Sequence, residues 1–156
     1  MNPATARLQR QASQRQRARQ SLAPMAVLRG IRNDFVETKE RLVVQAFEHE
    51  RATSEDYDFL AEMQGLLILA GCTSERRKPA AVYAKTVLGP ALDTLRERYL
   101  STGRFNCTED ELFVLRSFVS MYRDFWLKQP SELYVAAAHE LQAYHDRKAN
   151  HGSDES

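Results

Sequence analysis

The side chains that most often carry catalysis or hold metals are few and widely separated in this chain. It has four histidines and two cysteines, Cys72 and Cys107. A metal site on helices needs ligands about one turn apart, and no H-x-x-x-H, E-x-x-H or paired-cysteine pattern occurs. His139 and His145 are separated by roughly 120° around a helix, which keeps them from sharing an ion. The sequence therefore predicts neither a metal site nor a cofactor.

Nucleophilic and phosphate-binding motifs are missing as well. There is no G-x-S-x-G, and the six glycines are scattered singly rather than grouped in a phosphate loop. Cys107 precedes a predicted helix, whose dipole would lower its pKa, but no histidine lies within several residues and we interpret it as a small loop residue. His49 and His145 lie at the margins of apolar stripes and are interpreted as half-buried, hydrogen-bonded side chains. We expect a protein that is not an enzyme and has no small-molecule substrate.

Positive charge is concentrated at the start of the chain. Residues 1–33 carry seven arginines and no acid, whereas the remaining residues carry 15 basic and 21 acidic side chains, a net charge of −6. Arginine side chains pair well with phosphates and bind nucleic acids without sequence preference. The candidate nucleic-acid-binding residues of this arm are Arg7, Arg10, Arg15, Arg17 and Arg19. Two alternatives stay open: a solvated tail, or residues 1–24 as the product of a start codon upstream of Met25.

A second basic cluster, Arg76-Arg77-Lys78, stands directly before Pro79, the expected first residue of a helix. Side-chain charge and free backbone amides at such a position both favour an anion. We therefore add Arg76, Arg77 and Lys78 to the candidate nucleic-acid-binding residues. A solvated basic loop is the alternative.

Apolar residues recur at spacings of three and four through most of the chain, which predicts helices over about 25–51, 54–71, 79–101, 109–127 and 131–148. Ser54 is the expected N-cap of the second helix, and Thr108 with Glu111 forms a capping box for the fourth. Gly89-Pro90 interrupts the third, but its apolar stripe keeps its phase, so we expect one kinked helix. No alternating pattern typical of strands competes with these helices.

The helix over 25–51 has two apolar faces. Its expected core stripe includes Leu28, Phe35 and Leu42, while Val36, Val43 and Phe47 form a second seam roughly 100° away. A helix with two such faces is either central in a bundle or contacts a partner. We predict that Val36, Val43 and Phe47 bind a partner, together with Phe113, which lies among polar residues of its helix.

One stretch resembles a known group of proteins. Ser101-Thr102-Gly103-Arg104-Phe105, followed by Thr108-x-x-Glu111-Leu112 and a helix to Tyr122, is similar to uncharacterised small helical proteins encoded by phages and mobile elements of proteobacteria. The resemblance covers residues 50–146, mostly in the pattern of hydrophobic residues. It implies a bacterial cytoplasmic setting and no catalytic residue.

These observations predict an all-α protein with a single-domain bundle of about five helices at 25–148, a disordered basic arm at 1–24 and a disordered polar tail at 149–156. The longest apolar run, Leu66 to Ala70, is far shorter than the roughly 20 residues of a membrane span, so no membrane partner is expected. The favoured function is a helical module that binds a protein partner or itself. The alternative is an accessory protein that binds nucleic acid through the arginine arm.

Overall fold

The computed structural model describes residues 39–152, and every regular element in that range is a helix. The all-α prediction is therefore confirmed for this part of the chain. Within the described range, the residues from Glu40 onward form one compact unit. The predicted arm, the start of the first predicted helix and residues 153–156 lie outside the described residues.

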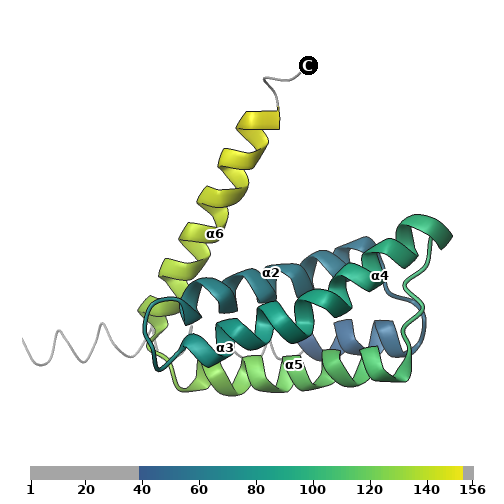
Figure 1. Ribbon diagram of the computed structural model, residues 1–156, viewed down its shortest axis with the longest axis horizontal. Coiled ribbons are helices and arrows are strands. Elements are labelled where there is room, and N and C mark those ends of the chain that lie inside the picture. Colours follow the sequence, from purple (N-terminus) through teal and green to yellow (C-terminus); the bar gives the residue numbers. More distant parts are fainter. Residues whose placement is uncertain (1–38, 153–156) are drawn as a thin grey trace, which may run out of the picture. The chain divides into compact units, whose positions relative to one another are not determined.

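The first described helix covers residues 39–48 and is followed by a turn. The labelled helices in Figure 1 are α2 (Ser54–Gly71), α3 (Lys78–Tyr83), α4 (Gly89–Thr102), α5 (Glu109–Leu127) and α6 (Ser131–Gly152). The π-helical segment η1 (Ala84–Leu88) joins α3 to α4. The predicted fifth helix is thus longer than expected, because α6 continues past residue 148, where we expected a tail.

Capping side chains fix the beginnings of α2 and α5. The Thr108 hydroxyl accepts a hydrogen bond of 3.2 Å from the Glu111 amide, and Glu111 accepts one of 2.9 Å from the Thr108 amide, which confirms the predicted capping box. In α2 the same arrangement is built by Thr53 and Asp56 rather than by Ser54. Thr53 is the cap because its backbone is extended and Asp56, at N3, accepts a hydrogen bond of 2.8 Å from its amide.

The segment from Lys78 to Thr102 is helical throughout, as the phase of its apolar stripe predicts. Pro90 has no amide hydrogen and its ring crowds the preceding turn, and the turn before it widens into the π-helical segment η1. The Gly89 amide donates to the Ala84 carbonyl, five residues back. Nε2 of Gln64, on α2, donates a second bond of 2.9 Å to the same carbonyl and ties the widened turn to its neighbour.

The main core lies between the helix over 39–48, α2, η1, α4 and α5. Its largest fully buried side chains are Phe47, Phe118, Leu60, Met63, Leu67, Leu88, Leu95 and Leu115. Phe105, in the loop between α4 and α5, closes one end of this core. Its ring stacks on Tyr99 at 4.3 Å and on Tyr57 at 5.4 Å between centroids. Gly103 ends α4 in the left-handed conformation, at φ 74°, which lets the chain turn so that Phe105 points inward.

The helix over 39–48 presents the opposite face from the one we expected. Val43 and Phe47, predicted to form a partner-binding seam, are buried in the core at 3% and 1% exposure. Leu42, from the predicted core stripe, is 57% exposed. The seam faces inward because Phe105 contacts Phe47 edge to face, at 5.7 Å between centroids, and because Val43 and Phe47 belong to the buried cluster shared with α2, η1, α4 and α5. The prediction that Val43 and Phe47 bind a partner is therefore wrong.

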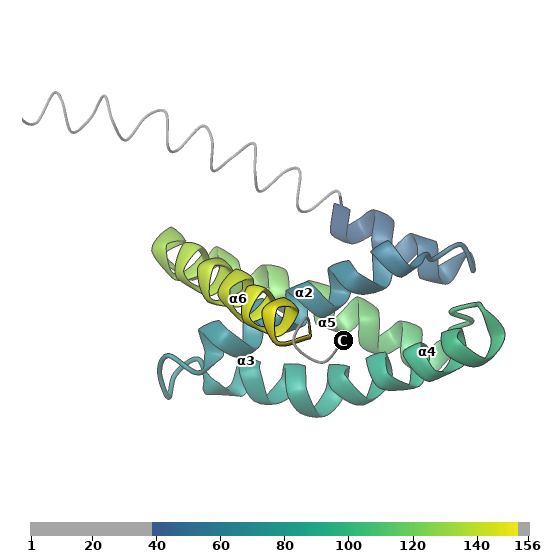
Figure 2. The same ribbon diagram turned by 90° about the horizontal axis from the view of Figure 1, so that it is seen from above.

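Helix α6 packs on α2 (Figure 2) and forms a second, smaller core there. Ala137 is buried there against Leu66 and Ala70. Leu141 lies over Gly65, where an added Cβ would come within 2.9 Å of its side chain. After Leu141 nearly every residue of α6 is exposed, and this half of the helix extends away from the other helices (Figure 1).

Candidate functional site

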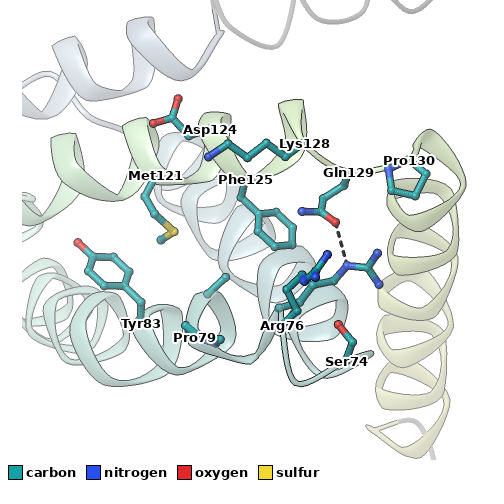
Figure 3. Close-up of a pocket in the computed structure, with 12 residues that line it drawn as sticks. Ser74, Arg76, Pro79, Tyr83, Met121, Asp124, Phe125, Lys128, Gln129 and Pro130 are labelled. Carbon is teal, nitrogen blue, oxygen red and sulfur yellow. Dashed lines mark hydrogen bonds between the residues drawn. The ribbon is translucent and has the colours of Figure 1, made fainter.

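The described part of the chain contains a groove of about 980 Å³ between two segments distant in sequence. One side is formed by the end of the α2–α3 loop and by α3, and the other by the C-terminal half of α5 and the residues that follow it (Figure 3). The residues that line it are Ser74, Arg76, Arg77, Pro79, Ala80, Tyr83, Met121, Asp124, Phe125, Lys128, Gln129 and Pro130.

The first side of the groove is held close to the end of α2. The Thr73 hydroxyl donates a hydrogen bond of 2.6 Å to the Ala70 carbonyl, which anchors the loop at its start. Gly71 is buried, and a Cβ on it would lie 2.5 Å from the Cβ of Ala81. Only glycine therefore allows α3 to approach α2 this closely, and the approach fixes where Ala80 and Tyr83 lie.

The floor of the groove is apolar. Met121 and Phe125 point from α5 toward α3, where Tyr83 and Ala80 complete the surface (Figure 3). Behind the floor, the Phe125 ring meets Trp126 edge to face at 5.0 Å between centroids, and Trp126 meets Tyr134 of α6 at 5.1 Å. Phe125 is thus supported by packed aromatic rings, and the floor is formed in advance of any ligand.

Arg77 joins the two sides. Its Nε donates a hydrogen bond of 2.8 Å to Oε1 of Gln129, and its Nη1 donates one of 3.1 Å to the Thr73 hydroxyl (Figure 3). These bonds hold the α2–α3 loop against the end of α5. The Ser74 carbonyl accepts hydrogen bonds from the Arg77 and Lys78 amides, each at 3.1 Å. These two amides, which we expected to be free for an anion, are therefore used within the loop.

Positive charge dominates the rim. Arg76 and Arg77 line one side and Lys128 the other, against a single lining acid, Asp124. Lys78, the third member of the predicted basic cluster, is not a lining residue and forms an exposed ion pair with Glu75 at 3.8 Å. The structure thus brings two of the three predicted basic residues to the groove and adds Lys128 from a distant segment.

The other predicted site residues lie elsewhere. Val36 and the five arm residues Arg7, Arg10, Arg15, Arg17 and Arg19 fall outside the described range. Phe113 is 69% exposed on α5, as its polar neighbours indicate, but it does not line the groove.

Groups suited to nucleophilic or metal chemistry do not gather in the groove. Cys107 is not a lining residue of the groove. Burial, together with Glu111, raises the pKa of its thiol to about 12. The lowered pKa that a helix dipole would give is thus absent at Cys107. His49 and His145, expected to be half-buried, are both exposed. Within residues 39–152 no cluster of three or more His, Cys, Asp or Glu side chains could hold a metal ion.

Sequence reasoning missed most of the floor and half of the rim. Met121 and Phe125 lie on the broad apolar face of the helix predicted over 109–127, and Lys128 and Gln129 fall between two predicted helices, so none of the four was a candidate site residue. The useful signal was the width of that face, about half the circumference of the helix, which exceeds the stripe a single neighbour covers. Such excess indicates an additional apolar surface but does not say which other segment lies opposite.

No protein-family model, no curated protein and no solved structure matches this chain. Among the described helices, none is both long and apolar enough to cross a membrane.

Proposed function

We propose that this protein is a non-enzymatic helical interaction module that holds a segment of another protein chain in the α3–α5 groove. The observation that carries the proposal is a preformed concave surface with an apolar floor and a polar, charged rim. Sites that capture peptides combine these two features, because apolar anchors supply affinity and rim groups fix orientation. The Arg77–Gln129 bond limits the freedom that binding would otherwise remove.

A random peptide library displayed on phage and selected against the full chain tests this proposal. Enriched peptides should bind the wild type and lose affinity for Met121→Gln, which removes an apolar side chain from the floor. Phe113→Gln is the matched control, since it changes an exposed apolar residue of the same helix outside the groove. Helical circular dichroism should be equal in the three proteins. Peptides that bind wild type and Met121→Gln equally would refute the groove as the binding site.

A second candidate function is supported by the charge of residues 1–33, which carry seven arginines and no acid. Such a segment binds DNA or RNA through phosphate contacts and displaces counterions. The full chain should then bind a labelled duplex or single strand with an affinity that falls steeply as salt is raised. Deletion of residues 1–24 should abolish the binding, and binding that survives the deletion would contradict a role for the arm.

A further inference from the structure

The charges around the groove are distributed unevenly. Arg77 is engaged by Gln129 and Thr73, whereas Arg76 and Lys128 are exposed on opposite sides of the groove. Neither of these two forms an ion pair within the part of the chain that the structure describes. With Arg77 they make three lining cations against one lining acid, Asp124, so the hollow has an excess of positive charge that would attract an anionic group.

Asp124 lies on the same helix as Lys128, four residues earlier, so the two side chains share one face of α5. Figure 3 shows the Lys128 side chain extending along α5 toward Asp124, so the only lining carboxylate lies on the Lys128 side of the groove and Arg76 stands on the other side.

We infer that the segment bound in the groove is an acidic amphipathic peptide of a partner protein. Its apolar side chains contact Tyr83, Met121 and Phe125, and its carboxylates lie between Arg76 and Lys128. The inference rests on the proposed function, because it specifies the chemistry of the segment that the module holds.

A peptide fits this surface better than a nucleic acid does. A phosphate backbone carries one negative charge per nucleotide and needs cationic side chains along its whole track. Here the concave surface is apolar, the lining cations are few, and Asp124 beside Lys128 would repel a phosphate. A peptide can place carboxylates near Arg76 and Lys128 and leave the rest of its length uncharged.

The first test is the charge of those library peptides whose binding is weakened by Met121→Gln. Those peptides should be enriched in Asp and Glu next to aromatic or aliphatic residues. A labelled probe with apolar residues at i, i+3 and i+4 and glutamates on the flanking positions should bind the full chain, and its glutamine counterpart should bind more weakly. Groove-dependent peptides that are neutral or basic would overturn the inference and leave the proposed function intact.

Charge reversal provides the second test. Arg76→Glu combined with Lys128→Glu should weaken the glutamate probe by about tenfold or more, since two attractive contacts become repulsive. The matched control, Lys85→Glu with Lys148→Glu, changes the net charge equally at exposed positions outside the groove. A probe with lysines in place of the glutamates should recover affinity for the groove variant, which excludes misfolding as the cause.

The lining acid gives a result of the opposite sign. Asp124→Asn should tighten binding of the glutamate probe about twofold to threefold by removing a like charge. Equal affinities for wild type and both double variants would refute the inference. Single-stranded DNA that binds the chain without residues 1–24, and that loses affinity for Met121→Gln, would identify nucleic acid as the occupant and overturn it too.

Discussion

The Nε atom of Arg77 donates a hydrogen bond of 2.8 Å to Oε1 of Gln129, joining two segments that are 52 positions apart in the chain. One segment precedes α3 and the other follows α5, so the bond holds together the two sides of the groove. A guanidinium can make this contact and still donate to Thr73, because its donors point in several fixed directions.

The Arg77–Gln129 pair should matter more for binding than for folding. Arg77→Lys and Gln129→Ala should each lower the free energy of unfolding by about 1 kcal/mol, because a partly exposed hydrogen bond contributes little. In a double-mutant cycle measured by urea unfolding, the coupling should lie near 1 kcal/mol. Affinity for a groove-dependent peptide should fall by a larger factor in Gln129→Ala than in Gln142→Ala, a control on α6. Equal effects of the two alanine variants on affinity would contradict a bridging role.

The reversed face of the helix over 39–48 predicts unequal effects at adjacent positions. Val43→Asp buries a carboxylate among apolar neighbours and should lower the free energy of unfolding by about 3 kcal/mol or more. Leu42→Asp changes an exposed side chain and should lie within about 0.5 kcal/mol of the wild type. Thermal and urea unfolding of both variants measure the difference. Similar losses for the two would mean that both faces of this helix are buried in solution.

Phe105 and Phe113 should respond very differently to truncation. Phe105 is buried between Tyr57 and Tyr99, so Phe105→Ala should cost about 3–5 kcal/mol through lost burial and the cavity left behind. Phe113→Ala removes an exposed ring and should change stability by no more than about 0.5 kcal/mol. Urea denaturation measures both free energies of unfolding, and the dependence of the free energy on urea concentration should be the same for the two variants. A small cost at Phe105 would show that the loop after α4 does not close the core.

Glu111 should make stability depend on pH. It accepts hydrogen bonds from Nη1 and Nη2 of Arg98, at 2.7 and 2.8 Å, and one from the Thr108 amide. The Arg98 bonds are the main cause of its lowered pKa, with the Thr108 amide adding to them against the effect of burial. Since the pKa is lower in the folded state, this stabilisation is complete above the ordinary carboxyl pKa of 4.5 and is lost as pH falls through the lowered value.

Urea unfolding of wild type and Glu111→Gln at pH 7 and at acidic pH measures this contribution. The variant should be less stable than the wild type at pH 7, and the difference should shrink as the pH is lowered below about 4. Glu109→Gln, an exposed acid in the same turn, should follow the wild-type profile. A constant difference at every pH would contradict the assigned role of the Glu111 charge.

Local signals in the sequence were sufficient to predict the order and approximate bounds of the helices from α2 onward. The T-x-x-E pattern at Thr108 specifies its own hydrogen bonds within four residues, and the phase of the stripe around Pro90 shows that the helix continues. The cap of α2 was predicted one residue too late, at Ser54 rather than Thr53, because both residue types are good caps and the choice depends on which of them Asp56 can bond.

The groove and the buried face of the helix over 39–48 could not be predicted in this way, because each depends on residues far away in the chain. Leu42 and Val43 are both apolar and neighbours in sequence, and only the position of Phe47 against Phe105 and α5 determines which of the two is buried. In the sequence, Arg76 and Lys128 belong to separate loops. The close approach of α3 to α2 at Gly71 and the Arg77–Gln129 bond place them on opposite sides of one hollow. Periodicity and capping are properties of a few adjacent residues, so the sequence by itself determined the helices. Packing between distant segments decides which helix faces are buried and where charged side chains come together. Only the tertiary structure supplies this packing.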